Sequence, residues 1–456
     1  MLTSYGRRVM RKLLLAGLGG AAALALSGCD SNGKSSSSPL GKTSTVCGTY
    51  SGKGCAPSNK RVDLAVPSFS HSTEITNPLF PISHGRSAVL LGHVDGKPFR
   101  TETTVLPGTQ TVGWNGHRVP VLISQYMAYL DGRLDEVAID RYAQADDGSV
   151  WYLGEDVFDY RKGAIAITEG TWLAGREGPA AMIMSAHAQL GDVFRPENAI
   201  GIVFEEVTVT SVGKTVAGPR GPVAGAILTK ELHSDRTTED KLFAPGYGEF
   251  RTSGGGDLEA LALEVPTDAL PGPPPTELES LSKGANGVLE LSRITEWEAA
   301  GATIERMNAA WATLSAGSPP PLIATRLTSN LAALTHAVKA RKPARAAQKA
   351  IDVLQSVLDL ELRHRAQSKI DAQRFHLWTQ QLRVDAAAQD LAAATGDVAV
   401  LEWIRDRITE RLDPAGRKEI AARLSALRGA TDARNLPAAA DHAARLGARL
   451  RGLARA

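Results

Sequence analysis

The sequence predicts an α+β protein of two domains, in which an antiparallel β meander is followed by an antiparallel α-helical bundle. Three observations predict this class. Apolar and polar residues alternate through much of 64–270, which is typical of strands. In 291–456 apolar residues recur every three or four positions, as on amphipathic helices. Between these regions PGPPPTE at 271–277 contains four prolines, and a segment so rich in proline forms neither helix nor regular strand.

The strands of the first region are separated by short connections, so we expect neighbours in the sequence to pair as an antiparallel meander. Asp146-Asp147-Gly148 marks one hairpin turn, and Pro245 with Gly246 should bend the strand expected at 240–250. A sheet of this size must curl into a half-barrel, barrel or sandwich to cover one face. The other expected strands are 118–132, 135–146, 149–160, 200–213, 223–232 and 257–265.

Prolines and one glycine divide the helical region. Pro343, Pro414 and Pro437 stand at positions typical of a first helical turn, and Gly396-Asp397 should end one helix and cap the next. Short loops between such helices favour an antiparallel bundle. The expected helices are 291–314, 322–341, 343–365, 370–395, 397–412, 414–427 and 437–453.

The chain begins with a segment typical of an exported protein. Four basic residues in 7–12 precede an apolar run at 13–26, which is too short to span a bilayer. Leu26-Ser27-Gly28-Cys29 resembles the bacterial lipobox, whose cysteine carries lipid such as palmitate. A plain signal peptide with an incidental cysteine is the alternative. The arginine pair in 7–12 resembles a twin-arginine signal, so export by the Sec or the twin-arginine route stays open.

The remaining two cysteines, Cys47 and Cys55, frame the short sequence CGTYSGKGC. Outside the cytoplasm an isolated pair tends to oxidise, which favours a disulfide over zinc binding. The layout that follows is a signal peptide, a flexible stalk with this loop, the β domain, a proline-rich linker and the helical bundle. Their boundaries are 1–28, 29–63, 64–270, 271–290 and 291–456. The change of apolar period across the linker predicts that the two main domains fold separately.

An ordered series of motifs in about 64–265 resembles an uncharacterised family of secreted bacterial proteins and lipoproteins. The resemblance implies a β architecture and export, and it brings no activity, cofactor or catalytic residue. The motifs are ITNPLFPIS (75–83), DGSVWYLGED (147–156), EGTWLAGREGPAAMIM (169–184), GDVFRPE (191–197) and EDKLFAPGYGEF (239–250).

Within these motifs lie five large apolar side chains suited to a ligand pocket on the concave face of the sheet: Trp151, Tyr152, Trp172, Met182 and Met184. The competing interpretation is that they complete the core of the domain itself. Substituting one of them would separate the two, because a core residue supports the fold and a pocket residue supports binding.

A metal site is the other candidate. Glu361 precedes His364 by three residues, and His376 follows on the next expected helix, so these side chains could approach one another. The second Glu-x-x-His pair of a di-iron bundle is missing, and arginines crowd the segment. Surface or capping histidines are therefore the alternative. The sequence contains neither the G-x-S-x-G nor the H-E-x-x-H motif.

Charge is distributed unevenly. Residues 64–270 carry 16 basic and 27 acidic side chains, whereas 322–456 carry 23 basic and 14 acidic. This asymmetry is explained by docking of the two domains, by solvated faces, or by attraction of the basic domain to anionic lipid headgroups or wall polymers. Nucleic acid is not an expected partner outside the cytoplasm.

We therefore expect an extracytoplasmic protein anchored to the cell membrane by lipid on Cys29. Its expected function is that of a non-catalytic binding or structural module, whose β domain presents a face to an apolar ligand or an envelope protein. No cofactor is expected. The alternative is an extracytoplasmic enzyme that uses a metal or a pair of carboxylates.

Overall fold

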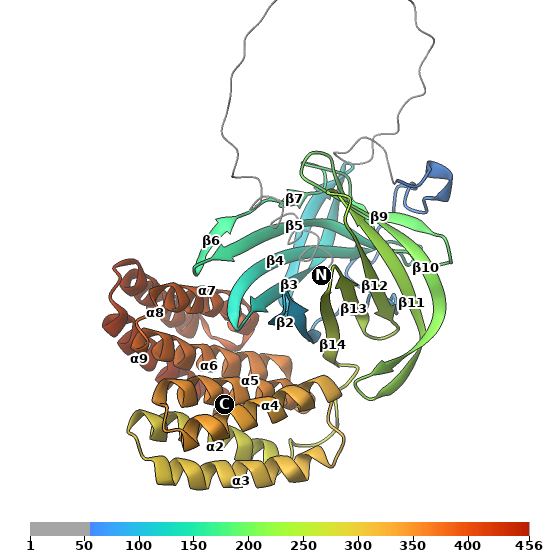
Figure 1. The fold of residues 1–456 in the computed structure, drawn as a ribbon. Coiled ribbons are helices and arrows are strands. Elements are labelled where there is room, and N and C mark those ends of the chain that lie inside the picture. Colours follow the sequence, from blue (N-terminus) through green and yellow to red (C-terminus); the bar gives the residue numbers. More distant parts are fainter. Residues whose placement is uncertain (1–54, 456) are drawn as a thin grey trace, which may run out of the picture.

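The computed structural model describes residues 55–455, with side chains as far as residue 449. An antiparallel sheet forms the first part and a group of helices the second, as the sequence predicts (Figure 1). A short 3-10 helix, η1 (Ser58–Lys60), precedes the sheet. The strands are β1 (Ser87–Val94), β2 (Lys97–Trp114), β3 (His117–Leu130), β4 (Arg133–Gln144), β5 (Val150–Arg161), β6 (Ala164–Ile167), β7 (Trp172–Leu173), β8 (Ala181–Met184), β9 (Val193–Ala199), β10 (Val203–Gly218), β11 (Gly221–His233), β12 (Thr238–Ala244), β13 (Gly248–Gly254) and β14 (Asp257–Val265).

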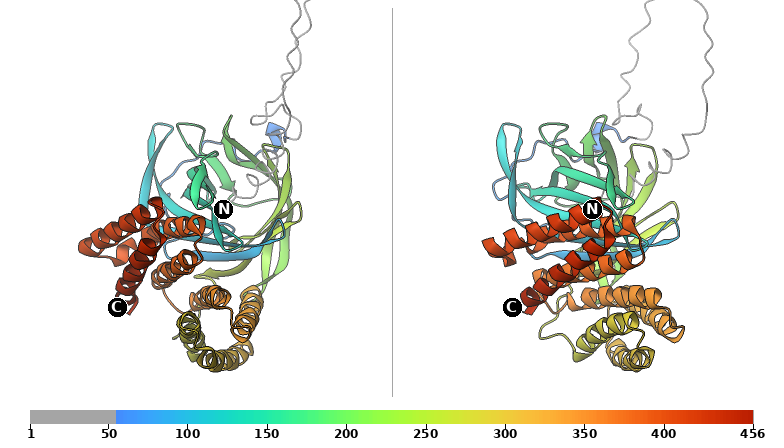
Figure 2. Two further views of the ribbon diagram at one scale, coloured as in Figure 1. Left: turned by 60° about the vertical axis from the view of Figure 1, so that its left-hand side comes forward. Right: turned by 90° about the vertical axis from the view of Figure 1, so that its left-hand side faces the viewer.

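Two meanders meet in the middle of the sheet. Within the described residues twelve of its 14 strands are ordered β6-β5-β4-β3-β2-β1-β14-β13-β12-β11-β10-β9, and the first strand of one meander pairs with the last of the other. β7 and β8 pair with β5, and β8 lies beside β9, so the two ends of the curved sheet approach each other. The side view in Figure 2 shows this curvature, with the helices outside it.

Turn chemistry sets the register of the first meander. Asp95-Gly96, Asn115-Gly116 and Asp131-Gly132 each form a two-residue connection in which both residues have a positive φ. This is the backbone of a type I′ turn, whose twist matches that of the flanking strands, and Asn or Asp before Gly adopts it most readily. The turn expected at Asp146–Gly148 also connects two strands, β4 and β5.

The segment expected as one bent strand at 240–250 is a hairpin instead. β12 ends at Ala244, β13 begins at Gly248, and these two residues pair. Gly246 has a φ of +81°, and its N–H donates to the carbonyl of Pro78. Because Pro245 and Gly246 form a turn rather than a bulge, the chain reverses where a bend was expected.

The helical part begins earlier than the sequence suggested. Its first helix starts at Thr276, directly after the prolines, so only about 271–275 of the expected linker 271–290 is irregular. In the described range the helices are α2 (Thr276–Arg293), α3 (Trp297–Ser315), α4 (Pro321–Lys339), α5 (Pro343–Glu361), α6 (Gln367–Ala387), α7 (Leu391–Ile408), α8 (Pro414–Asp432) and α9 (Leu436–Arg455), with a 3-10 turn, η2 (Thr409–Arg411), after α7.

The helix break expected at Gly396-Asp397 lies eight residues earlier, at 388–390. Asp390 caps α7, because its side chain accepts a hydrogen bond from the N–H of Ala393. Gly396 lies inside α7 for a packing reason. A Cβ on Gly163, in the turn between β5 and β6, would lie only 2.5 Å from the nitrogen of Gly396. Glycine here allows the sheet and the helix to approach at backbone distance.

The sheet and the helices share one hydrophobic core. A single cluster of buried residues combines strand residues such as Met127 and Val137 with helix residues such as Phe375 and Ile404. Tyr129 of β3 stacks on Trp378 of α6, with 5.4 Å between the ring centroids. Each part therefore covers an apolar face of the other.

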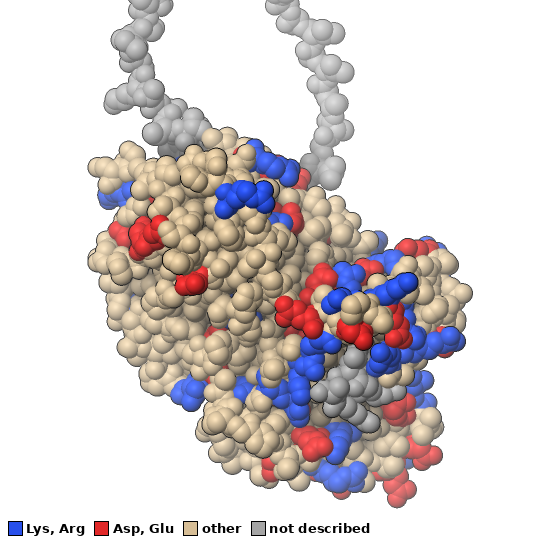
Figure 3. Space-filling view, turned by 180° about the vertical axis from the view of Figure 1, so that it is seen from behind, with Lys and Arg blue, Asp and Glu red and all other residues tan. Residues whose placement is uncertain are grey.

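Charged side chains are distributed unevenly over the surface. Figure 3 shows charged side chains gathered over the helical part, whereas most side chains on the visible face of the β part are uncharged. None of the described helices is long and apolar enough to cross a membrane. Cys55 is disulfide-bonded. Cys29 and Cys47, to which lipidation and disulfide pairing were assigned, lie outside the described residues.

Candidate functional site

The five aromatic and methionine residues proposed for a pocket are core residues. Their strands β7 and β8 both pair with β5, and each of the five side chains is at most 4 % exposed. Tyr152 stacks on Tyr142 at 4.9 Å and meets the edge of Trp172 at 5.5 Å. Its hydroxyl donates a hydrogen bond of 2.6 Å to Asp140. The interpretation that Trp151, Tyr152, Trp172, Met182 and Met184 complete the core therefore fits the structure, and the pocket interpretation does not.

A void beside this core is too small for an organic ligand. It lies between Phe80, Arg86, Tyr142 and Glu249 and has a volume of about 10 Å³. Such a volume holds about one water molecule. The sheet thus fills its own concave side in this region with side chains.

The residues proposed as metal ligands are not gathered into a site. The carboxylate of Glu361 pairs with Arg365 at 3.1 Å, and His376 lies against Gly447 of α9. Burial lowers the pKa of His364, and Arg363 and Arg365 lower it further. Within the described residues, Glu361, His364 and His376 do not form a group whose ligand atoms could share an ion. The helix spacing was suitable, but the side chains face different neighbours.

A groove suited to a ligand lies instead among the helices, where the C-terminal ends of α2 and α6 meet the N-terminal ends of α5 and α9. Its volume is about 480 Å³, within the range of about 300–1,000 Å³ that is usual for small-molecule sites. Leu289, Ala347, Val384 and Leu436 supply apolar lining. Six alanines and two prolines are among the lining residues, and their side chains are too short to fill the space between the helix ends.

Side chains make the rim of the groove cationic. Arg293 and Arg383 both line it, and the carboxylate of Glu290 lies 3.0 Å from the first and 3.8 Å from the second. Two guanidiniums and one carboxylate leave a net charge of +1. The dipoles of two helix N-termini and two helix C-termini oppose one another there, so the charged side chains determine the sign of the rim.

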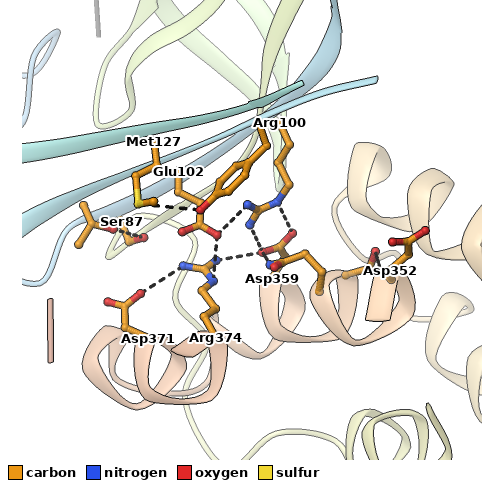
Figure 4. A network of polar contacts seen from close by, with 12 residues as sticks. Ser87, Arg100, Glu102, Met127, Asp352, Asp359, Asp371 and Arg374 are labelled. Atoms are coloured by element: carbon orange, nitrogen blue, oxygen red, sulfur yellow. Dashed lines mark hydrogen bonds and ion pairs between the residues drawn. The ribbon is translucent and has the colours of Figure 1, made fainter. Parts of the chain in front are cut away.

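A buried network of charges joins the sheet to the helices (Figure 4). Arg100 and Glu102 of β2 meet Asp359 of α5 and Arg374 of α6, and the ion pairs among them span 2.7–3.3 Å. Arg407 of α7 donates a hydrogen bond of 2.5 Å to Glu102 and another of 2.6 Å to Gln125 of β3.

The network is electrically balanced. With Asp371, which lies 3.4 Å from Arg407, it holds three arginines and three carboxylates. Burial alone would raise the pKa of Glu102, but Arg374, Arg100 and Arg407 hold it well below its usual range. All six side chains are at most 5 % exposed, so the network is a structural joint rather than a binding site.

A second buried polar cluster lies in the sheet, on β10, β11 and β12. Glu231 and His233 are two positions apart on β11 and so share one face, and Glu239 pairs directly with Glu231 on the next strand. Lys241 lies 2.6 Å from Glu231 and 3.1 Å from Glu239. Burial lowers the pKa of His233, which favours the neutral imidazole at neutral pH. This cluster is not among the sites predicted from the sequence, although the alternation in ELH (231–233) and EDK (239–241) indicates it.

No protein family model matches the chain, and no curated protein matches it. No periodicity marks the groove in the sequence, because its residues come from the ends of four helices that are far apart along the chain.

Proposed function

We propose that this protein is a lipid-anchored, extracytoplasmic binding protein whose ligand is an amphipathic anion, such as a long-chain carboxylate. The observation that carries the proposal is the groove between α2, α5, α6 and α9, with its apolar lining and cationic rim. An acyl chain would lie on Leu289, Val384 and Leu436, and a carboxylate would face Arg293 and Arg383. The ligand-binding role expected for the β domain thus moves to the helices.

Filling the groove should abolish this binding. Ala344 and Ala387 are exposed and line the groove, so a tryptophan at either position occupies it without disturbing the core. We expect Ala344→Trp and Ala387→Trp to weaken the binding of a fluorescent undecanoic acid by at least about tenfold, as measured by fluorescence titration of detergent-free protein. Such a loss corresponds to about 1.4 kcal/mol of binding free energy.

The matched control is Ala309→Trp, which places the same side chain on an exposed position of α3 outside the groove. It should bind the probe as the wild type does. Arg383→Gln should weaken binding of the carboxylate but not of the corresponding neutral alcohol. Equal binding by the wild type and both groove variants would exclude the groove as the site.

Removing the proposed anchor should release the protein from the membrane. Acyl chains contribute about 0.8 kcal/mol per buried methylene, so the two or three chains of a lipoprotein hold it firmly. We expect Cys29→Ala to move the protein from the membrane fraction to the soluble fraction. A Cys29→Ala protein that stays wholly with membranes in high salt would show that another part of the chain holds it there.

A further inference from the structure

The buried cluster on β10, β11 and β12 has the composition and spacing of a metal site. The ligand atoms of Glu231, His233 and Glu239 all lie within 4.8 Å of one another, and all three side chains are buried. Strand register holds them together, since Glu231 pairs with Glu239 across β11 and β12, and His233 pairs with Glu205 across β10 and β11. The backbone ladder thus fixes the positions of the ligands before any ion binds.

His233 provides an independent indication of a ligand. Its side chain is 4 % exposed, and among the described residues its Nε2 atom has no hydrogen-bond partner. The carboxylate of Glu239 is 3.7 Å from that atom, too far for a hydrogen bond. A buried polar atom without a partner is costly, and an ion placed between His233 and Glu239 would satisfy it.

The other ring nitrogen of His233 is already oriented. Its Nδ1 atom lies 3.4 Å from the carboxylate of Glu205. A carboxylate behind a histidine holds the proton on the near nitrogen and turns the lone pair of the far nitrogen toward a metal. Glu205 would therefore act as a positioning residue, while Nε2 points toward Glu239.

The charge balance indicates a divalent ion. Glu205, Glu231 and Glu239 contribute three carboxylates, and Lys241 is the one permanently charged cation that ion-pairs with them in the described residues. With a neutral imidazole the group lacks two positive charges. Two protons or one divalent cation could supply them, and a divalent cation placed there would at the same time be ligated by the lone pair of His233.

We propose that Glu231, His233 and Glu239 bind a divalent transition-metal ion of the Zn²⁺ class. One imidazole nitrogen with carboxylate oxygens is a donor set typical of zinc, whereas Mg²⁺ and Ca²⁺ prefer oxygen alone. The turn at 234–237 joins β11 to β12 directly beside His233 and carries the exposed Arg236. Lys241 contacts Glu231 and Glu239, so the ion would share these two carboxylates with its ammonium group.

The test is calorimetric titration of the full-length protein with Zn²⁺ after treatment with a chelator, together with its melting temperature. We expect about one equivalent of Zn²⁺ to bind and to raise the melting temperature. His233→Gln and Glu239→Gln should each abolish both effects, and Glu205→Gln should weaken binding by about 10- to 100-fold, as is usual for a residue that orients a ligand. Co²⁺ should give the visible absorption of a tetrahedral site in the wild type.

His187→Gln is the matched control, because His187 lies on an exposed loop and should leave the titration unchanged. Circular dichroism without metal shows whether each variant is folded. If His233→Gln does not fold, Glu239→Gln and the Co²⁺ spectrum of the wild type decide the question. Absence of stoichiometric binding by the wild type, or equal binding by folded wild-type and variant proteins, would overturn the proposal and leave protons as the neutralising species.

Discussion

Replacing Arg407 with methionine should lower the free energy of unfolding by about 3–5 kcal/mol, the usual cost of removing one partner from a buried ion pair. The guanidinium of Arg407 is fully buried and contacts Glu102, Asp371 and Gln125. Without it, the network that joins β2 to α5 and α6 would hold one carboxylate more than it has arginines. Chemical denaturation monitored by circular dichroism measures the loss.

Arg405 supplies the control on the same helix, two residues away. Among the described residues its guanidinium ion-pairs with its neighbour Asp406 alone, and it is 39 % exposed, so Arg405→Met should change stability by less than about 0.5 kcal/mol. Adding Asp371→Asn to Arg407→Met restores the charge balance and should recover part of the loss, which a double-mutant cycle would quantify. If Arg407→Met melts like the wild type, the network does not contribute to the stability of the joint.

Separating the sheet from the helices should prevent both from folding normally. Residues 55–270 produced alone would expose the apolar face that Phe375, Trp378 and Ile404 cover, and residues 276–456 would lose the strands on the other side. We expect each fragment to aggregate or to lose its cooperative melting transition. Coexpression of the two should restore a soluble complex with a single transition.

The opposite result would support the two-domain interpretation of the sequence. If each fragment is soluble and melts cooperatively by calorimetry, the shared core adds little to either half. A pair of fragments that dissociates on dilution, while each fragment keeps its secondary structure, would also support the two-domain interpretation.

Local chemistry in the sequence was sufficient to predict the class of fold. Alternation, hairpin dipeptides and the proline cluster at 271–275 identify a meander followed by helices, and these signals act over a few residues. The predictions from the sequence are wrong where a residue that is distant in the sequence determines the local structure. Gly396 resembles a helix terminator until its contact with Gly163 is known, and Pro245-Gly246 ends one strand and starts another.

The candidate sites were less accessible to prediction for the same reason. Trp151 and Met182 are large, polarisable side chains like those that line pockets. Their burial among other core residues shows that they belong to the core. Glu361 and His364 have the spacing of metal ligands, yet their neighbours turn them apart. The group of Glu231, His233 and Glu239 could be predicted from the sequence. Alternation along β11 places Glu231 and His233 on one face, and the hairpin to β12 places Glu239 beside Glu231.

The place where the N-terminal segment joins the sheet bears on the direction in which the groove between α2, α5, α6 and α9 would face in an anchored molecule. Arg61 forms a bridge with Val193 of β9, and the N–H of Ala56 donates to Glu206 of β10, so the N-terminal segment joins the sheet at its β9–β10 end. In Figure 1 this end and the helices lie on opposite sides of the molecule. A tether that pulls on β9 and β10 would leave the groove facing the aqueous space.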